Sequence, residues 1–560
     1  MFMKTLLQRA ILRRSSFKPF QTCLGTSPAL CISPAYCRKS YLESGFRHLT
    51  WRKHAKNLPL WILLSGHAVI MLGMHVSHVH AEDISVAEQA TGANEIGEAY
   101  ISNLRRIEDS SVISNEHTSK WRVFTDKGRE LFLQGKLDEA EHYFILALQE
   151  AKDGFGERDP HVASACNNLA ELYRIRKEFE KAEPLYLEAI DILDKSLGCD
   201  DIRVGFAFHN LGGFYLLQGK LEQARMCYEQ RALKIKGHVL GLANEHYATT
   251  LFHLGEVFYL QGKLKDSEAL IRDSIKILEE AGKGESVTCI KRMRRLAQIL
   301  LESNQLHEAE KIQRKILHVL ELSKGWTSLD TVLAAESLAM TLQSLGNLSE
   351  AQDLLERCLD ARKTILHENH IQVAANILQL ARVAMLKSSR LSKGNILEEI
   401  AELDKAKTLL ETSIRIARQT LEVPMAIAEN MSKNGKPSNC RRDKHAALVI
   451  LMKALDTLGR LEVTKHELSH ESKDRGIVPV EAEHALLQCI SAVKEFDIPE
   501  HVLSASDVKR EYLSCMRDLE ALLSESTGEK RQQSAKKLQE LRNEIRQIES
   551  ELSRSRKKGT

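Results

Sequence analysis

Apolar and small residues recur along this chain with one long, nearly constant period. The segments LFLQGKLDEAEHYF, YRIRKEFEKAEPLY and YLLQGKLEQARMCY share one order of apolar positions, turn and second apolar stretch. The small residue that marks each copy is separated from the next by 42, 42, 43, 42 and 42 residues, and falls at Ala140, Ala182, Ala224, Ser267, Ala309 and Ala351. Apolar positions at helical spacing with such a period predict consecutive helix pairs.

Each copy contains the residue types that a helix pair needs. A leucine followed by a small residue, as in Leu169-Ala170, allows the partner helix to cross closely. Gly135 and Gly219 can adopt the left-handed conformation that ends the first helix. One pair cannot bury its apolar stripe alone, so pairs must stack. The expected fold is all-α, a right-handed superhelical solenoid with a C-terminal helical and coiled-coil segment.

The end of the repeats and the composition of the flanking segments predict eight regions. They are a leader over 1–57, an apolar segment over 58–81, a linker over 82–120, six repeats over 121–365, a seventh repeat with an insertion over 366–421, a loop over 422–443, degenerate or capping helices over 444–525, and a short coiled-coil helix over 526–560.

A seam of apolar residues marks the last of these regions. Spacings of three and four alternate along it, at Leu538, Leu541, Ile545, Ile548 and Leu552, which is the pattern of a coiled coil. Two interpretations are open. The seam over 538–552 packs back on the repeats, or it joins two chains in an oligomer.

Charge is unevenly distributed along the chain, which has a net charge of +3. Residues 1–81 contain 11 Lys and Arg but a single acid, Glu43, leaving 68 of the 79 basic and 75 of the 76 acidic residues for the rest. The body is therefore mildly acidic. We expect no nucleic-acid partner, because such binding requires a basic surface that displaces counterions from phosphates.

The basic N-terminal region has the character of an organellar address. Lys4, Arg9 and Arg13 alternate with apolar residues, so a helix here would have one cationic and one apolar face. This pattern favours import into mitochondria, with plastids as the alternative. Residues 58–76 are almost wholly apolar, which predicts a membrane anchor, at the inner membrane if the organelle is a mitochondrion, or a sorting segment that is removed.

The repeats resemble a known family. The period and the phrases DPHVASACNNLAELY (159–173) and KAEPLYLEAIDI (181–192) are similar to tetratricopeptide repeats of the kinesin light chain type, over about residues 121–421. The resemblance weakens along the chain: Arg295, Ser337 and Gln379 stand where the second Asn of the phrase stands at Asn168. It implies a protein-binding scaffold without catalytic activity or cofactor. With the leader, an organellar assembly or adaptor factor is expected, and a kinesin light chain-like or co-chaperone adaptor is the alternative.

The resemblance also places a partner-binding groove. In this family the first helices of successive pairs line a concave face that meets an extended peptide. The positions carried over are Asn167, Asn168, Glu171, His209, Asn210, His253, Glu256, Lys291, Arg294, Arg295 and Gln298. Amide side chains suit peptide backbone because each offers a donor and an acceptor. Lys291, Arg294 and Arg295 share one side of a helix, where they clamp an acidic partner or pair with neighbouring acids of the chain itself.

Two further patterns bear on metal binding and on the thiols. The stretch from His466 to His470 (HELSH) matches the zinc-protease motif, in which His466 and His470 bind the metal and Glu467 activates water. Its polar flanks and the lack of an identifiable third ligand leave a metalloprotease as a remote alternative, and no metal is expected. The eight cysteines beyond the leader are widely spaced without a Cys-x-x-Cys pair, which predicts buried free thiols.

Overall fold

The computed structural model describes residues 116–390, 396–422, 438–469, 479–496, 500–524 and 530–558. The expected leader (1–57), the apolar segment (58–81) and most of the linker (82–120) lie outside these residues. Within the described ranges, no helix is both long and apolar enough to span a bilayer. The membrane anchor expected at 58–76 therefore stays a prediction.

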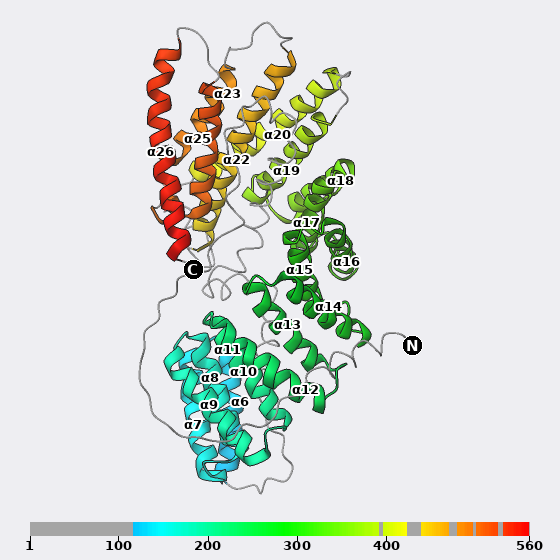
Figure 1. Cartoon of the computed structure of the whole chain (residues 1–560), viewed down its shortest axis with the longest axis vertical. Helices are drawn as coiled ribbons and strands as arrows, with labels where there is room; N and C mark the ends of the chain where they lie inside the picture. The colour runs from blue at the N-terminus through cyan, green and yellow to red at the C-terminus, as the bar shows by residue number, and fades with distance from the viewer. Residues whose placement is uncertain are drawn as a thin grey trace, which may run out of the picture. The chain divides into compact units, whose positions relative to one another are not determined.

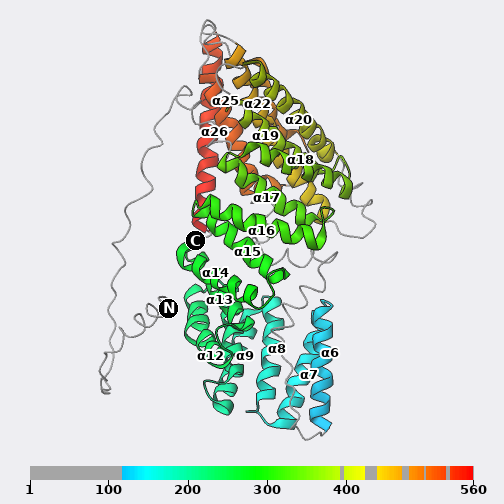
Figure 2. The ribbon, with the colours of Figure 1, turned by 90° about the vertical axis from the view of Figure 1, so that its right-hand side faces the viewer.

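The described residues fold into stacked helix pairs, which confirms the all-α solenoid (Figures 1 and 2). Helices adjacent in sequence also pack against each other, as Figure 2 shows for α6, α7 and α8. The pairs are α6 (Glu116–Leu133) with α7 (Leu137–Phe155), α8 (Pro160–Ile175) with α9 (Phe179–Leu197), α10 (Ile202–Leu217) with α11 (Leu221–Arg225), η2 (Met226–Ala232) and α12 (Leu233–Val239), α13 (Glu245–Leu260) with α14 (Leu264–Glu280), α15 (Val287–Glu302) with α16 (Leu306–Lys324), α17 (Leu329–Leu345) with α18 (Leu348–Ile365), and α19 (Ile371–Ser388) with α20 (Ile396–Glu422).

Local signals at the helix ends fix this arrangement. The first helices of pairs two to four begin after Asp159, Asp201 and Asn244, whose side chains accept hydrogen bonds of 2.9, 2.8 and 2.8 Å from the backbone N–H two residues further on. Such a cap satisfies a donor that the helix start leaves open. Gly135 and Gly219 follow first helices at φ 75° and 71°, as their left-handed role predicts.

The two helices of a pair approach most closely at the small residue of the first helix. A Cβ on Gly212 would lie 2.9 Å from the ring of Tyr228, and one on Gly255 would lie 2.8 Å from Ile271. In both pairs the bulky contact residue lies 16 positions after the glycine. Close crossing thus explains why these positions carry glycine or alanine.

The same packing signature identifies an eighth pair, formed by α22 (Ser438–Ser469) and α23 (Val480–Glu495). A Cβ on Gly459 would lie 2.8 Å from Leu486, and the small residue Ala482 is fully buried four positions earlier. The loop expected over 422–443 is thereby corrected at its end, because α22 begins at Ser438. Residues 423–437 lie outside the described ranges.

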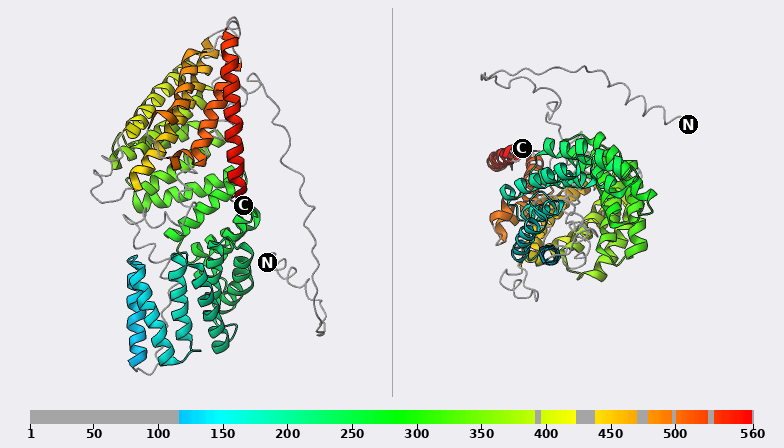
Figure 3. Two further views of the ribbon diagram at one scale, coloured as in Figure 1. Left: turned by 90° about the vertical axis from the view of Figure 1, so that its left-hand side faces the viewer. Right: turned by 90° about the horizontal axis from the view of Figure 1, so that it is seen from below.

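Helices α24 (Glu500–Leu503), α25 (Ser506–Ser524) and α26 (Lys530–Lys558) follow this pair, and α26 runs along α25 (Figure 3). The predicted seam of α26 packs inward, since Leu541 and Ile545 are buried in the same core as α25, with Leu538, Ile548 and Leu552 partly buried against it. Of the two interpretations of the apolar seam over 538–552, the structure shows the one in which the seam packs on the chain's own helices.

The expectation of free thiols is correct for part of the cysteines only. Cys166, Cys227, Cys289 and Cys358 are buried and free, but Cys199 is exposed, and Cys489 and Cys515 form a disulfide. The reason is tertiary. Helices α23 and α25 both pack on α22, which brings two residues 26 positions apart to a Cα–Cα distance of 6.2 Å.

Candidate partner-binding face

The predicted groove residues lie on the first helices α8, α10, α13 and α15, and many of them contact one another from helix to helix. We call the predicted groove residues on these four helices, together with the side chains that link them, the inner-face ladder. Its first rung joins the second and third pairs: Asn210 Nδ2 donates a 2.9 Å hydrogen bond to Asn167 Oδ1. Both amides and Asn168 are buried. The amides that suit peptide backbone are thus partly engaged within the protein.

Glu171 is also engaged inside its own pair. Its carboxylate is 2% exposed, accepts a 2.5 Å hydrogen bond from the hydroxyl of Tyr186, and lies 2.8 Å from Arg174 Nη2. A buried carboxylate needs such partners, because it has lost its hydration. Glu171 therefore positions Tyr186 and Arg174 and is not an open contact for a partner.

The next rung is built around Thr250. Its hydroxyl has one hydrogen, which it donates to the backbone oxygen of His246 at 3.0 Å. It must therefore accept from Lys236 Nζ at 2.9 Å and from His209 Nδ1 at 3.0 Å. This places the proton of His209 on Nδ1.

His253 is half-buried in the same region, and its ring stacks on Tyr228 with a centroid distance of 5.9 Å. Burial, followed by the charges of Arg292, Lys291, Lys236 and Arg174, lowers the pKa of His253 to about 3. Each of these cations disfavours a second positive charge nearby. His253 is consequently neutral at pH 7, and the surrounding potential is positive.

Arg295 binds within the ladder. Its Nε and Nη2 contact the two oxygens of Glu256 at 2.6 and 2.9 Å, and Nη1 donates to Gln298 Oε1 at 2.7 Å. Gln298 in turn donates to the Tyr259 hydroxyl at 2.9 Å. Of the two interpretations of the basic run, pairing with neighbouring acids thus holds for Arg295.

The two other basic candidates are more open. Lys291 is exposed, and no acid among the described residues forms an ion pair with it. Arg294 has a side-chain exposure of 39% and its nearest acid, Asp330, is 4.0 Å away. A pair at that distance and exposure contributes little. Lys291 and Arg294 are therefore the cations of this run that a partner can reach.

Arg292 lies between Lys291 and Arg294 in sequence, and the sequence pattern does not predict its structural role. It is 1% exposed and donates to Ser274 Oγ at 2.7 Å and to Thr249 Oγ1 at 2.9 Å. Burial lowers its pKa to about 10, so it remains charged at neutral pH. Its position on the helix could have indicated this burial, since Arg292 lies off the stripe of Lys291 and Arg294 and faces the neighbouring pair.

Only part of the zinc motif lies within the described residues. His466 is half-buried and Glu467 exposed at the end of α22, while His470 lies outside the described residues. No group of three His, Cys, Asp or Glu side chains placed to hold a metal occurs within the described ranges.

The fold and the repeat register define a class. The tetratricopeptide repeat family model matches residues 127–195, 163–236, 203–280 and 286–364. These residues are tetratricopeptide repeats, and helix pairs of this type form a scaffold suited to protein–protein interaction.

Two groups of curated relatives share the repeats. Protein KINESIN LIGHT CHAIN-RELATED 3 of Arabidopsis thaliana is 23% identical over 282 residues, which are 50% of this chain and 41% of that protein. Tetratricopeptide repeat protein 19, mitochondrial, of Homo sapiens is 24% identical over 220 residues, 36% of this chain and 57% of that protein. The chain thus spans about two fifths of the kinesin light chain-related protein that it matches. The repeats are thus similar to those of kinesin light chain-related proteins.

Solved structures with similar helix arrangements include the nearly identical TPR-like repeats of Podosopora anserina, at 19% identity and a TM-score of 0.33, covering 39% of this chain and 96% of that one. The apo form of RapI is 13% identical with a TM-score of 0.41, and covers 69% of this chain and 100% of that one.

Proposed function

We propose that this chain is an organellar scaffold that holds an acidic segment of a partner protein against Lys291 and Arg294 of α15. The observation that supports this proposal is that the basic residues within 291–295 differ in their contacts and exposure. Arg295 is bound by Glu256 and Arg292 is buried, whereas Lys291 is exposed and Arg294 has only a distant acid. Open cations beside a positive interior attract carboxylates more strongly than isolated surface cations do.

The rest of the inner-face ladder supports this role by holding the first helices in register. The contacts of Asn210 with Asn167 and of Arg295 with Glu256 join neighbouring first helices directly. A rigid face loses less freedom when it binds, which raises affinity without any new contact. In this proposal the ladder preorganises the face, and Lys291 and Arg294 contact the partner.

Fluorescence anisotropy tests the binding chemistry on the full chain. The probe is a labelled peptide pool of about 12 residues with about half of its positions Glu, and the matched pool has Gln at those positions. The variant Lys291→Glu/Arg294→Glu should weaken binding of the acidic pool at least about tenfold, because attraction becomes repulsion.

The matched control is Lys276→Glu/Lys311→Glu, which makes the same charge change on the second helices α14 and α16. Both lysines have a side-chain exposure of 72%. Their variant should bind the acidic pool like the unchanged protein. Equal affinity of the charge-reversed α15 variant, or equal binding of the Gln pool, contradicts the proposed site.

The compartment is proposed from two supports. The basic leader over 1–57 resembles a transit peptide, and three relatives at 23–24% identity carry the name Tetratricopeptide repeat protein 19, mitochondrial. An assembly role at the inner membrane rests on the apolar segment over 58–76. Protease protection of the full chain in isolated mitochondria, before and after the outer membrane is opened, tests both the mitochondrial compartment and the position at the inner membrane. Persistent cytosolic recovery of the chain would overturn the assignment.

A further inference from the structure

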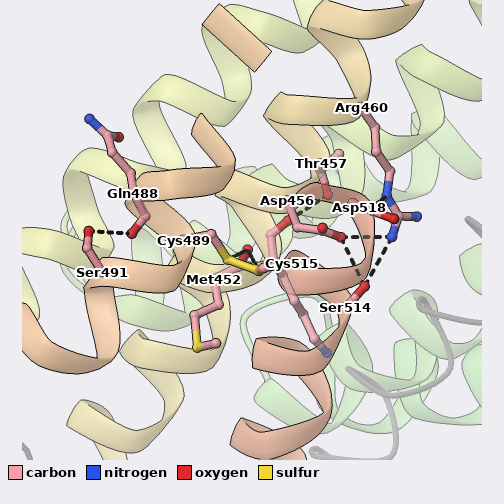
Figure 4. The surroundings of a disulfide bond; sticks show 11 residues. Met452, Asp456, Thr457, Arg460, Gln488, Cys489, Ser491, Ser514, Cys515 and Asp518 are labelled. Carbon is pink, nitrogen blue, oxygen red and sulfur yellow. Dashed lines mark hydrogen bonds and ion pairs between the residues drawn. A yellow bond between two sulfur atoms is a disulfide. The ribbon is translucent and has the colours of Figure 1, made fainter. Parts of the chain in front are cut away.

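Helix α25 docks on α22 through a row of polar pairs. His445 Nε2 lies 2.7 Å from Asp507 Oδ2, Lys453 Nζ lies 3.5 Å from a Glu511 oxygen, and Arg460 Nε lies 2.5 Å from Asp518 Oδ2. Positions on the two helices rise together, so α22 and α25 run parallel. We call this row the polar seam; Figure 4 shows its end at Asp456, Arg460, Ser514 and Asp518.

The seam occupies the continuation of the candidate binding face. In the repeat register, Gly459 of the eighth pair corresponds to Ala297 of the fifth. Lys453 then corresponds to Lys291, Asp456 to Arg294 and Arg460 to Gln298, by equal offsets from the small residue. Lys453 and Asp456 are only 1% and 6% exposed. The positions that are open on α15 are therefore covered on α22.

A disulfide ties this cover to the eighth pair. Cys489 on α23 and Cys515 on α25 are both fully buried, and their sulfurs lie 3.3 and 3.9 Å from the backbone oxygen of Met452 on α22 (Figure 4). A disulfide has no S–H to donate, but two thiols at these positions could each donate to that oxygen. The site therefore provides an acceptor for the reduced state as well.

We propose that α25 and α26 form a cap over the C-terminal end of the binding face, and that the Cys489–Cys515 disulfide locks this cap in place. The idea that the covered face binds a partner rests on the proposed function; the lock does not. With the lock closed, the face ends before α22. With the cap lifted, Lys453, Asp456 and Arg460 lengthen it by one pair.

The lock closes by thiol–disulfide exchange with a small disulfide such as oxidised glutathione. One cysteine thiolate attacks the small disulfide, forms a mixed disulfide and releases one small thiol. The second cysteine thiolate attacks the mixed disulfide, forms the Cys489–Cys515 bond and releases the second small thiol. Two protein thiols are oxidised and one small disulfide is reduced, and a small dithiol reverses the reaction.

Access to the sulfurs depends on the polar seam. Because both are fully buried, neither can meet a reagent while α25 lies on α22, so exchange occurs only when the cap lifts. The seam and the apolar contacts around it set how often that happens. Reduction of this bond should therefore report the opening of the cap.

The test is the rate at which dithiothreitol reduces the bond in the folded full chain, followed by alkylation and mass spectrometry of Cys489 and Cys515. Asp518→Asn removes a charged acceptor of Arg460 and should speed reduction about tenfold. The matched control is Arg517→Gln on the same helix, whose pair with Glu549 is exposed, and it should stay within about twofold.

Three results would overturn the lock. They are equal rates for Asp518→Asn and Arg517→Gln, reduction as fast as that of oxidised glutathione itself, and a lack of the bond after incubation with oxidised glutathione. If Asp518→Asn does not fold, hydrogen exchange of α22 and α25 in the unchanged chain replaces it. Faster exchange in both helices after reduction is then expected, and unchanged exchange contradicts the cap. None of these measurements uses the acidic peptide, so their outcome does not depend on whether the proposed function is correct.

Discussion

Arg295 of α15 and Glu256 of α13 form a two-point contact between neighbouring first helices, with N–O distances of 2.6 and 2.9 Å. Both side chains are largely shielded, at 13% and 14% exposure. A charged group that loses its partner in such a place keeps its desolvation cost without the compensating attraction. This contact therefore stabilises the register of two pairs and is not available to a partner.

Glu256→Gln should accordingly destabilise the chain by about 3 kcal/mol, seen as a lower Tm in calorimetry. The control is Arg294→Gln, one residue before Arg295 in sequence, whose distant pair and 39% exposure predict a change below about 0.5 kcal/mol. A double variant Glu256→Gln/Arg295→Gln should cost less than the sum of the two single changes, since neither charge is left alone. Additive losses would show that the contact contributes nothing specific.

His253 predicts how the repeats respond to acid. Its pKa is about 3 in the folded chain against an ordinary value of 6.5, because burial and four cations disfavour its charged form. Between these two pH values the unfolded chain binds the proton and the folded chain does not. The stability contributed by this site is therefore complete above pH 6.5 and declines as the pH falls.

The expected loss from His253 is about 2 kcal/mol at pH 5 relative to pH 7. His253→Gln should remove that part of the acid response, measured as the difference in unfolding free energy between the two pH values. His307→Gln is the control, because the side chain of His307 on α16 is 82% exposed. An identical acid response in the chain with His253→Gln would contradict the lowered pKa of this imidazole.

The arrangement of helix pairs could be predicted because it depends on regular spacing. Small residues about 42 positions apart, with apolar neighbours, place the crossing point of each pair, and Gly212 and Gly255 lie there in the structure. First-helix membership of the candidate residues follows from the same register. The sequence therefore supplied the fold and the helices of the site.

The contacts that individual side chains make could not be predicted from the regular spacing. The partner of Arg295 is 39 residues away and that of Arg460 is 58 away, and neither distance is a repeat length. Whether a basic residue is open or occupied depends on such offsets and on burial. For the same reason the sequence could not show that Cys489 faces Cys515, because that contact arises where α23 and α25 meet on α22.

Two adjacent glycines of α10 test the close crossing of the third pair. A Cβ on Gly212 would lie 2.9 Å from the buried ring of Tyr228, whereas one on Gly213 would lie 3.4 Å from the Tyr228 hydroxyl only. Gly212→Ala should destabilise the chain by about 1–3 kcal/mol through overpacking.

Gly213→Ala is the matched control and should stabilise the chain by up to about 1 kcal/mol, because alanine favours the helix and its methyl group fits. Urea unfolding measured by circular dichroism compares the two variants. Stabilisation by both substitutions would show that the crossing has more room than these distances allow.

The one interval of 43 residues in the repeat has a physical counterpart. It spans the second helix of the third pair, where η2 (Met226–Ala232) is a π-helical turn between α11 and α12. A π-turn contains one residue more than the α-helical turn that it replaces. Both flanks therefore keep the faces of the other repeats, with Ala224 before the turn, Tyr228 within it and Ile235 after it all buried.

Deleting the exposed residue Gln230 should consequently be tolerated, because it restores the 42-residue interval and allows α11, η2 and α12 to form one α-helix. We expect a Tm within a few degrees of the unchanged chain and full helical circular dichroism. Deleting Glu188, its counterpart in α9, is the control. There no extra residue is present, so the deletion rotates everything after it by about 100° and turns Ala189 and Ile192 away from the core. That loss of burial should cost several kcal/mol. Equal damage from the two deletions would mean that the π-turn is needed for its own geometry, and that the extra residue is not simply an insertion that the helix absorbs.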